Sequence, residues 1–231
     1  MGRRASVNAG LDLATWQCAS VLLDYPDPGQ DDRLPAVRAA VAAHPELSAR
    51  FGPFLDWRDA SDLPHIQAEY VETFDNRRRC NLFLTYFAHG DTRKRGLALL
   101  RFKQTYLAAG VSPDPAELPD HLAVVLEFAA TVDRDAGRQL LLDHRAGLEV
   151  LRLSLVDLGS PWASVVAAVC ATLPPLHGNE WDAIRKLAAD GPPEEEVGLT
   201  PYGTPGFDAA VTGPAPGPVD LPMPTVSRRG A

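Results

Sequence analysis

Hydrophobic residues recur at spacings of three and four along most of the first 190 residues, and no stretch shows the sustained alternation of a strand. Such spacing gives a helix one apolar face. The first predicted helix has its apolar face at Leu13, Trp16, Ser20 and Leu23. It ends in the run 24–29, because proline disfavours helical geometry in the residue before it and lacks a backbone donor. A second predicted helix, around 34–41, ends at His44-Pro45.

The longest predicted helix starts at Asp62, or at Ser61, as its N-cap. Its apolar face is formed by Leu63, Ile66, Tyr70 and Phe74. The same spacing continues toward Tyr86 and Phe87, which predicts either one long helix or two helices joined near Asp75.

Capping residues predict further helices downstream. Asp91 is the expected N-cap of a helix that Gly110 closes in the left-handed conformation. Pro119, a residue type favoured in the first turn, is expected to start the next helix. Another helix follows Asp133, and a last one begins at Asn179.

The composition changes beyond residue 190. Residues 191–231 hold nine prolines and seven glycines, so this segment cannot bury enough apolar surface to offset its ordering entropy. We therefore expect a single-domain helical bundle over residues 1–190 and a disordered Pro/Gly-rich tail over 191–231. The predicted fold class is all-α.

Cysteine usage and hydropathy indicate the compartment. The three cysteines are tens of residues apart, which fits reduced, buried thiols better than a disulfide framework or a zinc site. No apolar stretch approaches the ~20 residues of a membrane span. Arg3-Arg4 is not followed by the uninterrupted apolar region of a leader. We expect a cytoplasmic protein with no direct membrane insertion.

Charge is distributed unevenly along a chain of net charge -8. The stretch 77–103 has eight basic residues and one acidic residue, whereas 112–135 has six acidic residues and one basic residue. One interpretation is internal pairing, as for Asp91 and Arg95 at i,i+4 spacing. The other is a polarised surface, with a basic interface at Arg93, Lys94 and Arg95 suited to a phosphate-bearing or acidic partner and an acidic face suited to a basic peptide. Both stay open at this point.

The sequence does not contain the signature of a catalytic or metal site. There is no His-Glu-x-x-His, no Gly-x-Ser-x-Gly and no glycine-rich phosphate loop. We expect neither catalytic residues nor metal ligands. An all-α transcription regulator could place 92–107 on phosphates, but such proteins are usually basic, and the isoelectric point here is about 5.2. We expect no nucleic-acid partner.

Three short motifs follow one another along the sequence and distinguish this chain from other helical proteins. They are Tyr-Val-Glu-Thr-Phe-Asp at 70–75, His-Gly-Asp at 89–91 and Glu-Leu-Pro-Asp-His-Leu at 117–122, preceded by Leu-Leu-Asp-Tyr-Pro-Asp at 22–27. Together they resemble the nitrate reductase molybdenum cofactor assembly chaperones, the delta-subunit branch of the redox enzyme maturation proteins. The resemblance covers about residues 11–190.

The resemblance implies an all-helical cytoplasmic chaperone that is not an enzyme. Such a protein binds the N-terminal segment of the apo catalytic (alpha) subunit of respiratory nitrate reductase and assists molybdenum cofactor insertion before membrane docking. The molybdenum bis-pterin guanine dinucleotide is handled on the client, and no cofactor is bound permanently. Another molybdoenzyme is the alternative client.

The resemblance also implies which residues contact the client. The expected client-binding positions are Tyr70, Phe74, Asp75, His89, Asp91, Glu117, Pro119, Asp120 and His121. Local chemistry leaves an alternative for Asp120, because an acidic side chain in the first turn of a helix also serves as a cap. We expect the Asp120 carboxylate to pair with a basic side chain of the client.

Overall fold

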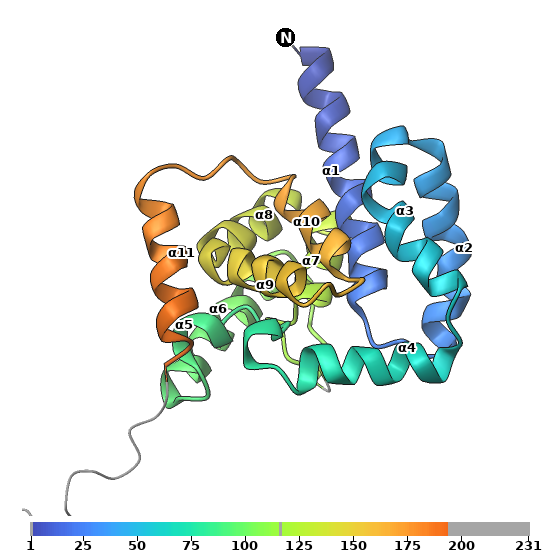
Figure 1. Ribbon diagram of the computed structural model, residues 1–231. Coiled ribbons are helices and arrows are strands. Elements are labelled where there is room, and N and C mark those ends of the chain that lie inside the picture. The colour runs from blue at the N-terminus through green and yellow to red at the C-terminus, as the bar shows by residue number, and fades with distance from the viewer. Residues whose placement is uncertain (1, 116, 194–231) are drawn as a thin grey trace, which may run out of the picture. The chain divides into compact units, whose positions relative to one another are not determined.

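The computed structural model describes residues 2–115 and 117–193, which contain eleven α-helices and no strand beyond one isolated bridge (Figure 1). The all-α prediction is confirmed. All but three residues of the predicted tail lie outside the described residues, so the boundary at 190 stays a prediction. The helices are α1 (Gly2–Leu23), α2 (Pro28–Ala43), α3 (Pro45–Asp59), α4 (Leu63–Tyr70), α5 (Tyr86–His89), α6 (Arg93–Ala108), α7 (Leu122–Thr131), α8 (Arg134–Asp143), α9 (Arg145–Asp157), α10 (Ala163–Cys170) and α11 (Asn179–Asp190).

The C-terminal half of α1 lies in the middle of the core. It packs against α2, α7 and α10, and its Trp16 and Leu22 are almost fully buried. Burial of a large apolar side chain stabilises the fold by roughly 1.5–3 kcal/mol. The indole Nε1 of Trp16 also donates to Thr172 Oγ1 at 2.8 Å, so its polar atom has a partner inside the protein.

Because α1 ends inside the protein, its last carbonyl groups need donors from elsewhere in the chain. Nε2 of Gln30 on α2 donates to the carbonyls of Val21 and Asp24, both at 2.8 Å. The indole Nε1 of Trp162, just before α10, donates to the carbonyl of Leu22 at 3.0 Å. Two further elements are therefore attached to the same helix end.

Tyr70, the last residue of α4, supplies the third donor. Its hydroxyl donates to the carbonyl of Leu23 at 3.0 Å, and burial raises the pKa of this phenol. The ring contacts those of Tyr25, Phe74 and Trp162, with centroids 4.7–5.6 Å apart. The aromatic motif thus joins α4 to the end of α1.

The long helix predicted from Asp62 begins as expected and ends early. The Asp62 carboxylate accepts from His65 N at 2.9 Å, which confirms the N-cap. A π-helical turn at Val71–Asp75 and a 3₁₀ turn at Arg78–Cys80 follow α4. The predicted continuation toward Phe87 is wrong, because the backbone at 82–84 pairs with another loop instead of forming helix.

Other helix boundaries also differ from the predicted ones. The helix α3 was not predicted, although Leu47 and Phe51 lie on its buried face. The helix expected from Pro119 begins at Leu122, since the preceding residues pair with 82–84. Thr92 occupies the N-cap position expected for Asp91.

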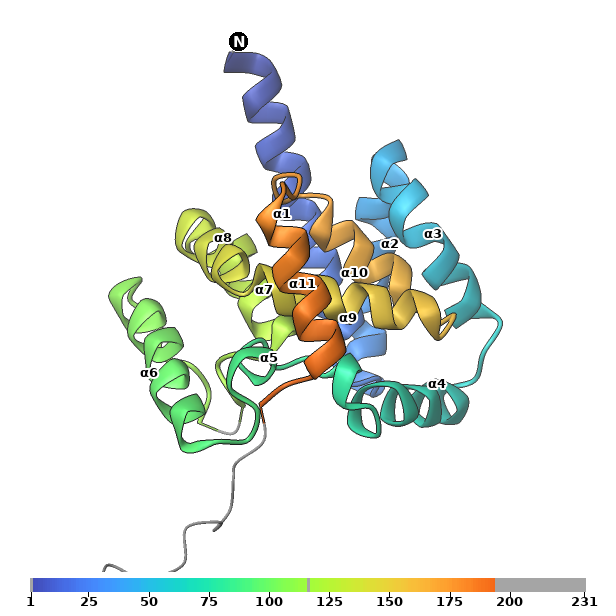
Figure 2. The same ribbon diagram turned by 60° about the vertical axis from the view of Figure 1, so that its left-hand side comes forward.

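At the edge of the bundle lies α6 (Figure 2). Its buried side chains are Phe102 and Tyr106, which contact the rings of His144 and Phe128. The Tyr106 hydroxyl donates to the carbonyl of Pro119 at 2.7 Å. Among the residues that the structure describes, no helix is long and apolar enough to cross a membrane.

Replacing Tyr70 by phenylalanine tests the anchoring of α1. The variant leaves the buried carbonyl of Leu23 without its donor, so the free energy of unfolding should fall by ~1–2 kcal/mol. Tyr25→Phe is the matched control, because Tyr25 is 44% exposed. Urea denaturation followed by circular dichroism gives both values, and equal losses in the two variants would contradict the anchoring role.

Candidate functional site

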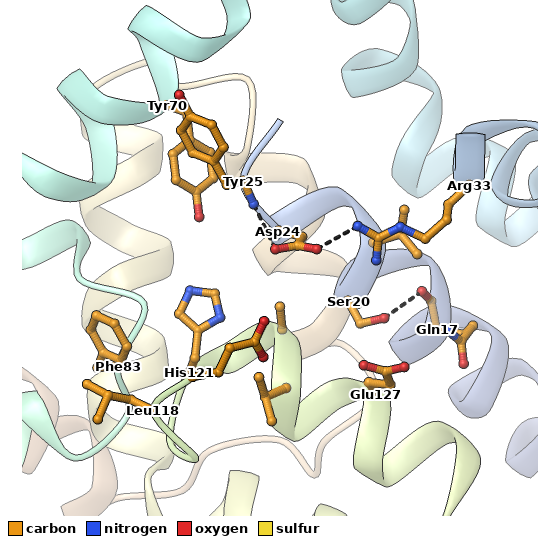
Figure 3. Close-up of a pocket in the computed structure, with 14 residues that line it drawn as sticks. Gln17, Ser20, Asp24, Tyr25, Arg33, Tyr70, Phe83, Leu118, His121 and Glu127 are labelled. Atoms are coloured by element: carbon orange, nitrogen blue, oxygen red, sulfur yellow. Dashed lines mark hydrogen bonds and ion pairs between the residues drawn. The ribbon is translucent and has the colours of Figure 1, made fainter. Parts of the chain in front are cut away.

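A cavity of about 560 Å³ lies beside the end of α1 (Figure 3). Its wall comes from α1 and the residues after it, α2, α4, α7 and two loops. The lining residues are Gln17, Ser20, Val21, Asp24, Tyr25, Arg33, Tyr70, Phe83, Glu117, Leu118, His121, Ala123, Val124 and Glu127. We call it the acidic cavity, because carboxylates outnumber basic side chains in its lining.

Aromatic rings form one side of the acidic cavity. Tyr25 and Tyr70 meet edge to face with ring centroids 5.4 Å apart. Phe83 and His121 meet in the same manner at 5.2 Å, and Leu118 lies next to them. This side therefore offers flat apolar surface to an incoming side chain or helix turn.

Carboxylates give the cavity its electrostatic character. Asp24, Glu117 and Glu127 line it, against a single guanidinium, that of Arg33. Arg33 Nη2 donates to Asp24 Oδ2 at 2.6 Å, which neutralises one carboxylate. Burial, followed by repulsion from neighbouring carboxylates including Asp24 and Glu127, raises the pKa of Glu117. Burial lowers the pKa of His121, which keeps its ring neutral near pH 7.

Two loops are joined by backbone hydrogen bonds beside the cavity. Leu84 N donates to the Asp120 carbonyl at 3.0 Å, and Leu122 N donates to the Leu82 carbonyl at 2.9 Å. The pair forms the isolated antiparallel bridge between Phe83 and His121. Because residues opposite each other in a bridge share a face, this pairing brings the two rings together at the cavity wall.

The side chain of Asp120 lies behind this bridge and is fully buried. Its Oδ2 accepts from Thr85 N at 3.2 Å and from Thr85 Oγ1 at 2.5 Å. Arg95 Nη2 lies 3.7 Å from the same oxygen, and Arg95 Nε donates to Thr85 Oγ1 at 3.2 Å. The carboxylate therefore holds the two loops and α6 together, and it does not line the acidic cavity.

Arg95 extends this network to the His-Gly-Asp motif. Its Nη1 donates to Asp91 Oδ1 at 3.1 Å, so the pairing expected at i,i+4 spacing is present. The guanidinium carbon lies 5.3 Å from the centroid of the Phe83 ring. Its side chain is only 15% exposed, so of the three residues of the predicted basic interface, Arg93 and Lys94 are exposed and Arg95 faces inward.

The turn of this motif requires glycine. Gly90 has a φ of 55°, and a Cβ at this position would lie 1.8 Å from the carbonyl oxygen of Pro193. Only glycine fits such a conformation and such a close approach without strain. His89, just before it, does not reach the acidic cavity and lines a separate cleft between α6 and α8.

The structure thus places some of the predicted client-binding residues at the acidic cavity and others elsewhere. Tyr70, Glu117 and His121 line the acidic cavity. Phe74 is buried behind Tyr70, and Asp75 is exposed away from the lining. The remaining four, none of which lines the acidic cavity, are His89 at the end of α5 and Asp91, Pro119 and Asp120 in turns.

Several lining residues were not predicted from sequence. Asp24 and Tyr25 belong to the motif at 22–27, which was interpreted only as the end of a helix. Phe83 lies between the motifs at 70–75 and 89–91, whereas Leu118 is part of the motif at 117–122 but was not assigned to the site. The backbone pairing of two loops that are far apart in sequence, at Phe83 and His121, is what brings them to the cavity.

Within the described residues, no group of three or more histidine, cysteine, aspartate or glutamate side chains could hold a metal ion. The three thiols, Cys18, Cys80 and Cys170, are buried and form no disulfide. Burial raises the pKa of each of them, to about 11 for Cys18 and Cys80 and about 12 for Cys170. These cysteines are therefore packing residues at neutral pH.

Comparison with known proteins places the chain in a family. The family model described as nitrate reductase delta subunit matches residues 35–168. The chain is 33% identical over 162 residues to the probable nitrate reductase molybdenum cofactor assembly chaperone NarJ of Bacillus subtilis, a match that covers 69% of this chain and 88% of that protein. It is 32% identical over 148 residues to NarJ of Escherichia coli K12, covering 62% of this chain and 63% of that protein.

A longer relative also matches. The chain is 45% identical over 165 residues to the nitrate reductase-like protein NarX of Mycobacterium tuberculosis H37Rv. The match covers 68% of this chain and 24% of NarX, so the chain spans about a quarter of that relative. Because the family model covers more than half of the sequence and the Bacillus subtilis relative is 33% identical over 69% of it, the chain belongs to the nitrate reductase delta subunit family.

Proposed function

We propose that this protein is an assembly chaperone for a nitrate reductase, and that the acidic cavity binds the N-terminal segment of the apo catalytic subunit. The names of the NarJ relatives, which describe molybdenum cofactor assembly chaperones, support this assignment. The protein acts in the cytoplasm, without catalytic activity of its own. It keeps the client open for insertion of the molybdenum bis-pterin guanine dinucleotide before the enzyme docks at the membrane.

The observation that carries the proposal is the meeting of family motifs at one cavity. Tyr25, Tyr70 and His121 come from three motifs that are far apart in sequence, and all three line it. A surface shared by separate motifs is a place where a partner can contact all of them at once. The aromatic side receives an apolar side chain of the client segment.

The charge of the cavity indicates which client residue enters it. Two carboxylates, those of Glu117 and Glu127, have no guanidinium partner among the lining residues, because Arg33 is paired with Asp24. A client segment with a lysine or arginine beside an apolar residue therefore complements this cavity in shape and charge.

Neutralising both carboxylates tests this proposal. In Glu117→Gln/Glu127→Gln, affinity for a peptide that copies the client N-terminus should fall about tenfold, or ~1.4 kcal/mol, because each partly exposed charge contributes under ~1 kcal/mol. Calorimetric titration measures the change, and thermal melting checks the fold.

Asp157→Asn is the control, since Asp157 is exposed on α9 and does not line the cavity. A peptide in which the basic residues are replaced by glutamine should bind wild type and the double variant equally. Wild-type affinity of the double variant for the unmodified peptide would exclude the cavity as the site, and peptides from other molybdoenzymes report the choice of client.

Acidification should weaken the same binding. The pKa of His121 lies below its ordinary value of 6.5, and that of Glu117 lies above its ordinary value of 4.5. Because its pKa is raised, Glu117 takes up a proton and loses its negative charge at a higher pH than an ordinary glutamate, which releases a basic segment. His121 gains its positive charge only below pH 6.5, and this charge repels a basic segment. Affinity measured at pH 7.0 and 5.0 should drop, and His121→Gln should reduce the drop. Equal affinity at the two values would argue against a basic ligand.

Asp120 has an indirect role in this proposal. The sequence interpretation had its carboxylate in contact with the client, but the buried position of Asp120 favours a role in holding Phe83 and His121 in place. Asp120→Asn should lower the free energy of unfolding by ~3 kcal/mol, as expected when a buried ion pair loses one partner.

Asp91→Asn is the matched control, because it removes the exposed partner of the same Arg95 and should cost less than ~1 kcal/mol. Denaturant unfolding and peptide titration are done on both variants. If Asp120→Asn keeps wild-type stability and loses peptide binding, the direct contact inferred from sequence is right and the positioning role is wrong.

A further inference from the structure

The outer face of α6 has properties that neither the core nor the acidic cavity explains. Its inner face packs through Phe102 and Tyr106. On the opposite face, Leu97, Leu100 and Leu107 are 72%, 49% and 60% exposed, the highest values of any leucine in the described part of the chain. Isolated exposed leucines are ordinary, whereas a set gathered on one helix marks a surface for interaction.

The leucines form a narrow stripe with heptad spacing. Positions 97, 100, 104 and 107 follow one another at intervals of three, four and three, with Gln104 in the third place. At 100° per residue the three leucines span roughly 80° of the helix circumference. A stripe of this width is the contact line of a coiled coil, whereas a helix that lies in a membrane surface presents a wider apolar face.

Basic residues border the stripe on both sides. Lys94 and Arg101 lie on one flank and Lys103 on the other, and α6 contains no acidic residue. Within the described residues these three side chains form no ion pair. In coiled coils the flanking positions carry the charges that select the partner.

The sequence of α6 also places positive charge where helix stability disfavours it. Arg93, Lys94 and Arg95 fill the first turn, and basic residues there oppose the positive end of the helix dipole. Arg95 is explained by its contacts with Asp91 and Thr85. The stability of the helix alone does not account for Lys94.

We propose that the outer face of α6 is a second docking surface, and that it binds an acidic amphipathic helix of a partner protein. The leucines of the stripe pack against apolar residues that repeat at three and four in the partner helix. Lys94, Arg101 and Lys103 pair with glutamate or aspartate on its flanks. A second copy of this chain is disfavoured as the occupant, since two α6 helices would bring like charges together.

This surface differs in chemistry from the acidic cavity. One accepts a basic segment and the other an acidic helix, so a partner could contact both with segments of opposite charge. The α6 proposal does not rest on the chaperone assignment. Its experiment therefore uses probes that carry no sequence from a nitrate reductase.

The probe is a 21-residue synthetic helix with leucine at heptad positions a and d and glutamate at e and g, labelled for fluorescence anisotropy. A second peptide has lysine in place of glutamate. The 231-residue chain should bind the acidic peptide at least about tenfold more tightly than the basic one, and salt should weaken this binding.

Two variants assign the binding to α6. Leu97→Gln/Leu107→Gln should weaken it about tenfold or more, and Arg101→Glu/Lys103→Glu should reverse the preference toward the basic peptide. The control is Val156→Gln/Leu158→Gln, which removes two exposed apolar residues elsewhere. Circular dichroism verifies that every variant is folded.

The proposal is overturned if the acidic peptide binds no better than the basic one, or if the leucine variant binds like wild type. Vesicles with 25% phosphatidylglycerol form a separate arm of the experiment. Leucine-dependent binding to these vesicles without binding to the acidic peptide would identify α6 as a membrane-surface helix instead. Self-association in ultracentrifugation that the leucine variant abolishes would identify a second copy as the occupant.

Discussion

The hydrogen bonding of the buried end of α1 is the constraint on which the rest of the fold depends. A helix that stops inside a protein leaves carbonyl groups that water cannot reach, and each needs a donor. Here Gln30, Trp162 and Tyr70 supply the donors from three different elements. Because each of these side chains has a fixed length, its hydrogen bond holds α2, α4 or the start of α10 at a fixed distance from the end of α1.

That arrangement also determines where the candidate site lies. Asp24 and Tyr25 come directly after the capped helix end, and Tyr70 contributes both a donor and a face of the acidic cavity. The second part of the wall depends on a different buried group, the Asp120 carboxylate, which joins two loops through Thr85. The motifs that resemble the family's therefore include residues, such as Asp120, that do not line the cavity but hold the lining residues in place.

Sequence periodicity was sufficient to predict the fold class and most of the helices, because each helix reports its own apolar face. It failed where the chain pairs with a distant segment. Residues 82–84 continue the helical spacing of apolar residues in the sequence, yet their backbone forms hydrogen bonds with residues 120 and 122. The same long-range pairing explains why Pro119 does not start a helix and why Phe83 could not be assigned to the site. The helix α3 was missed for a local reason, since Pro53 within it is a residue type that ordinarily ends a helix, yet the helix continues through it.

The motif at 70–75 contains the π-helical turn Val71–Asp75, so the number of residues in the motif matters more than the identity of each one. A π turn contains one more residue than an α turn, so removing a residue between Tyr70 and Phe74 would leave a regular α turn and place Phe74 at a different angle about the helix axis relative to Tyr70. Phe74 would then leave the rings of Tyr70 and Trp162, which it contacts at 4.7 and 5.3 Å. Glu72 lies on the exposed side of the same turn, where one side chain can replace another without moving the aromatic group. Relatives that keep this architecture should therefore align across the motif without gaps, even where their exposed residues differ.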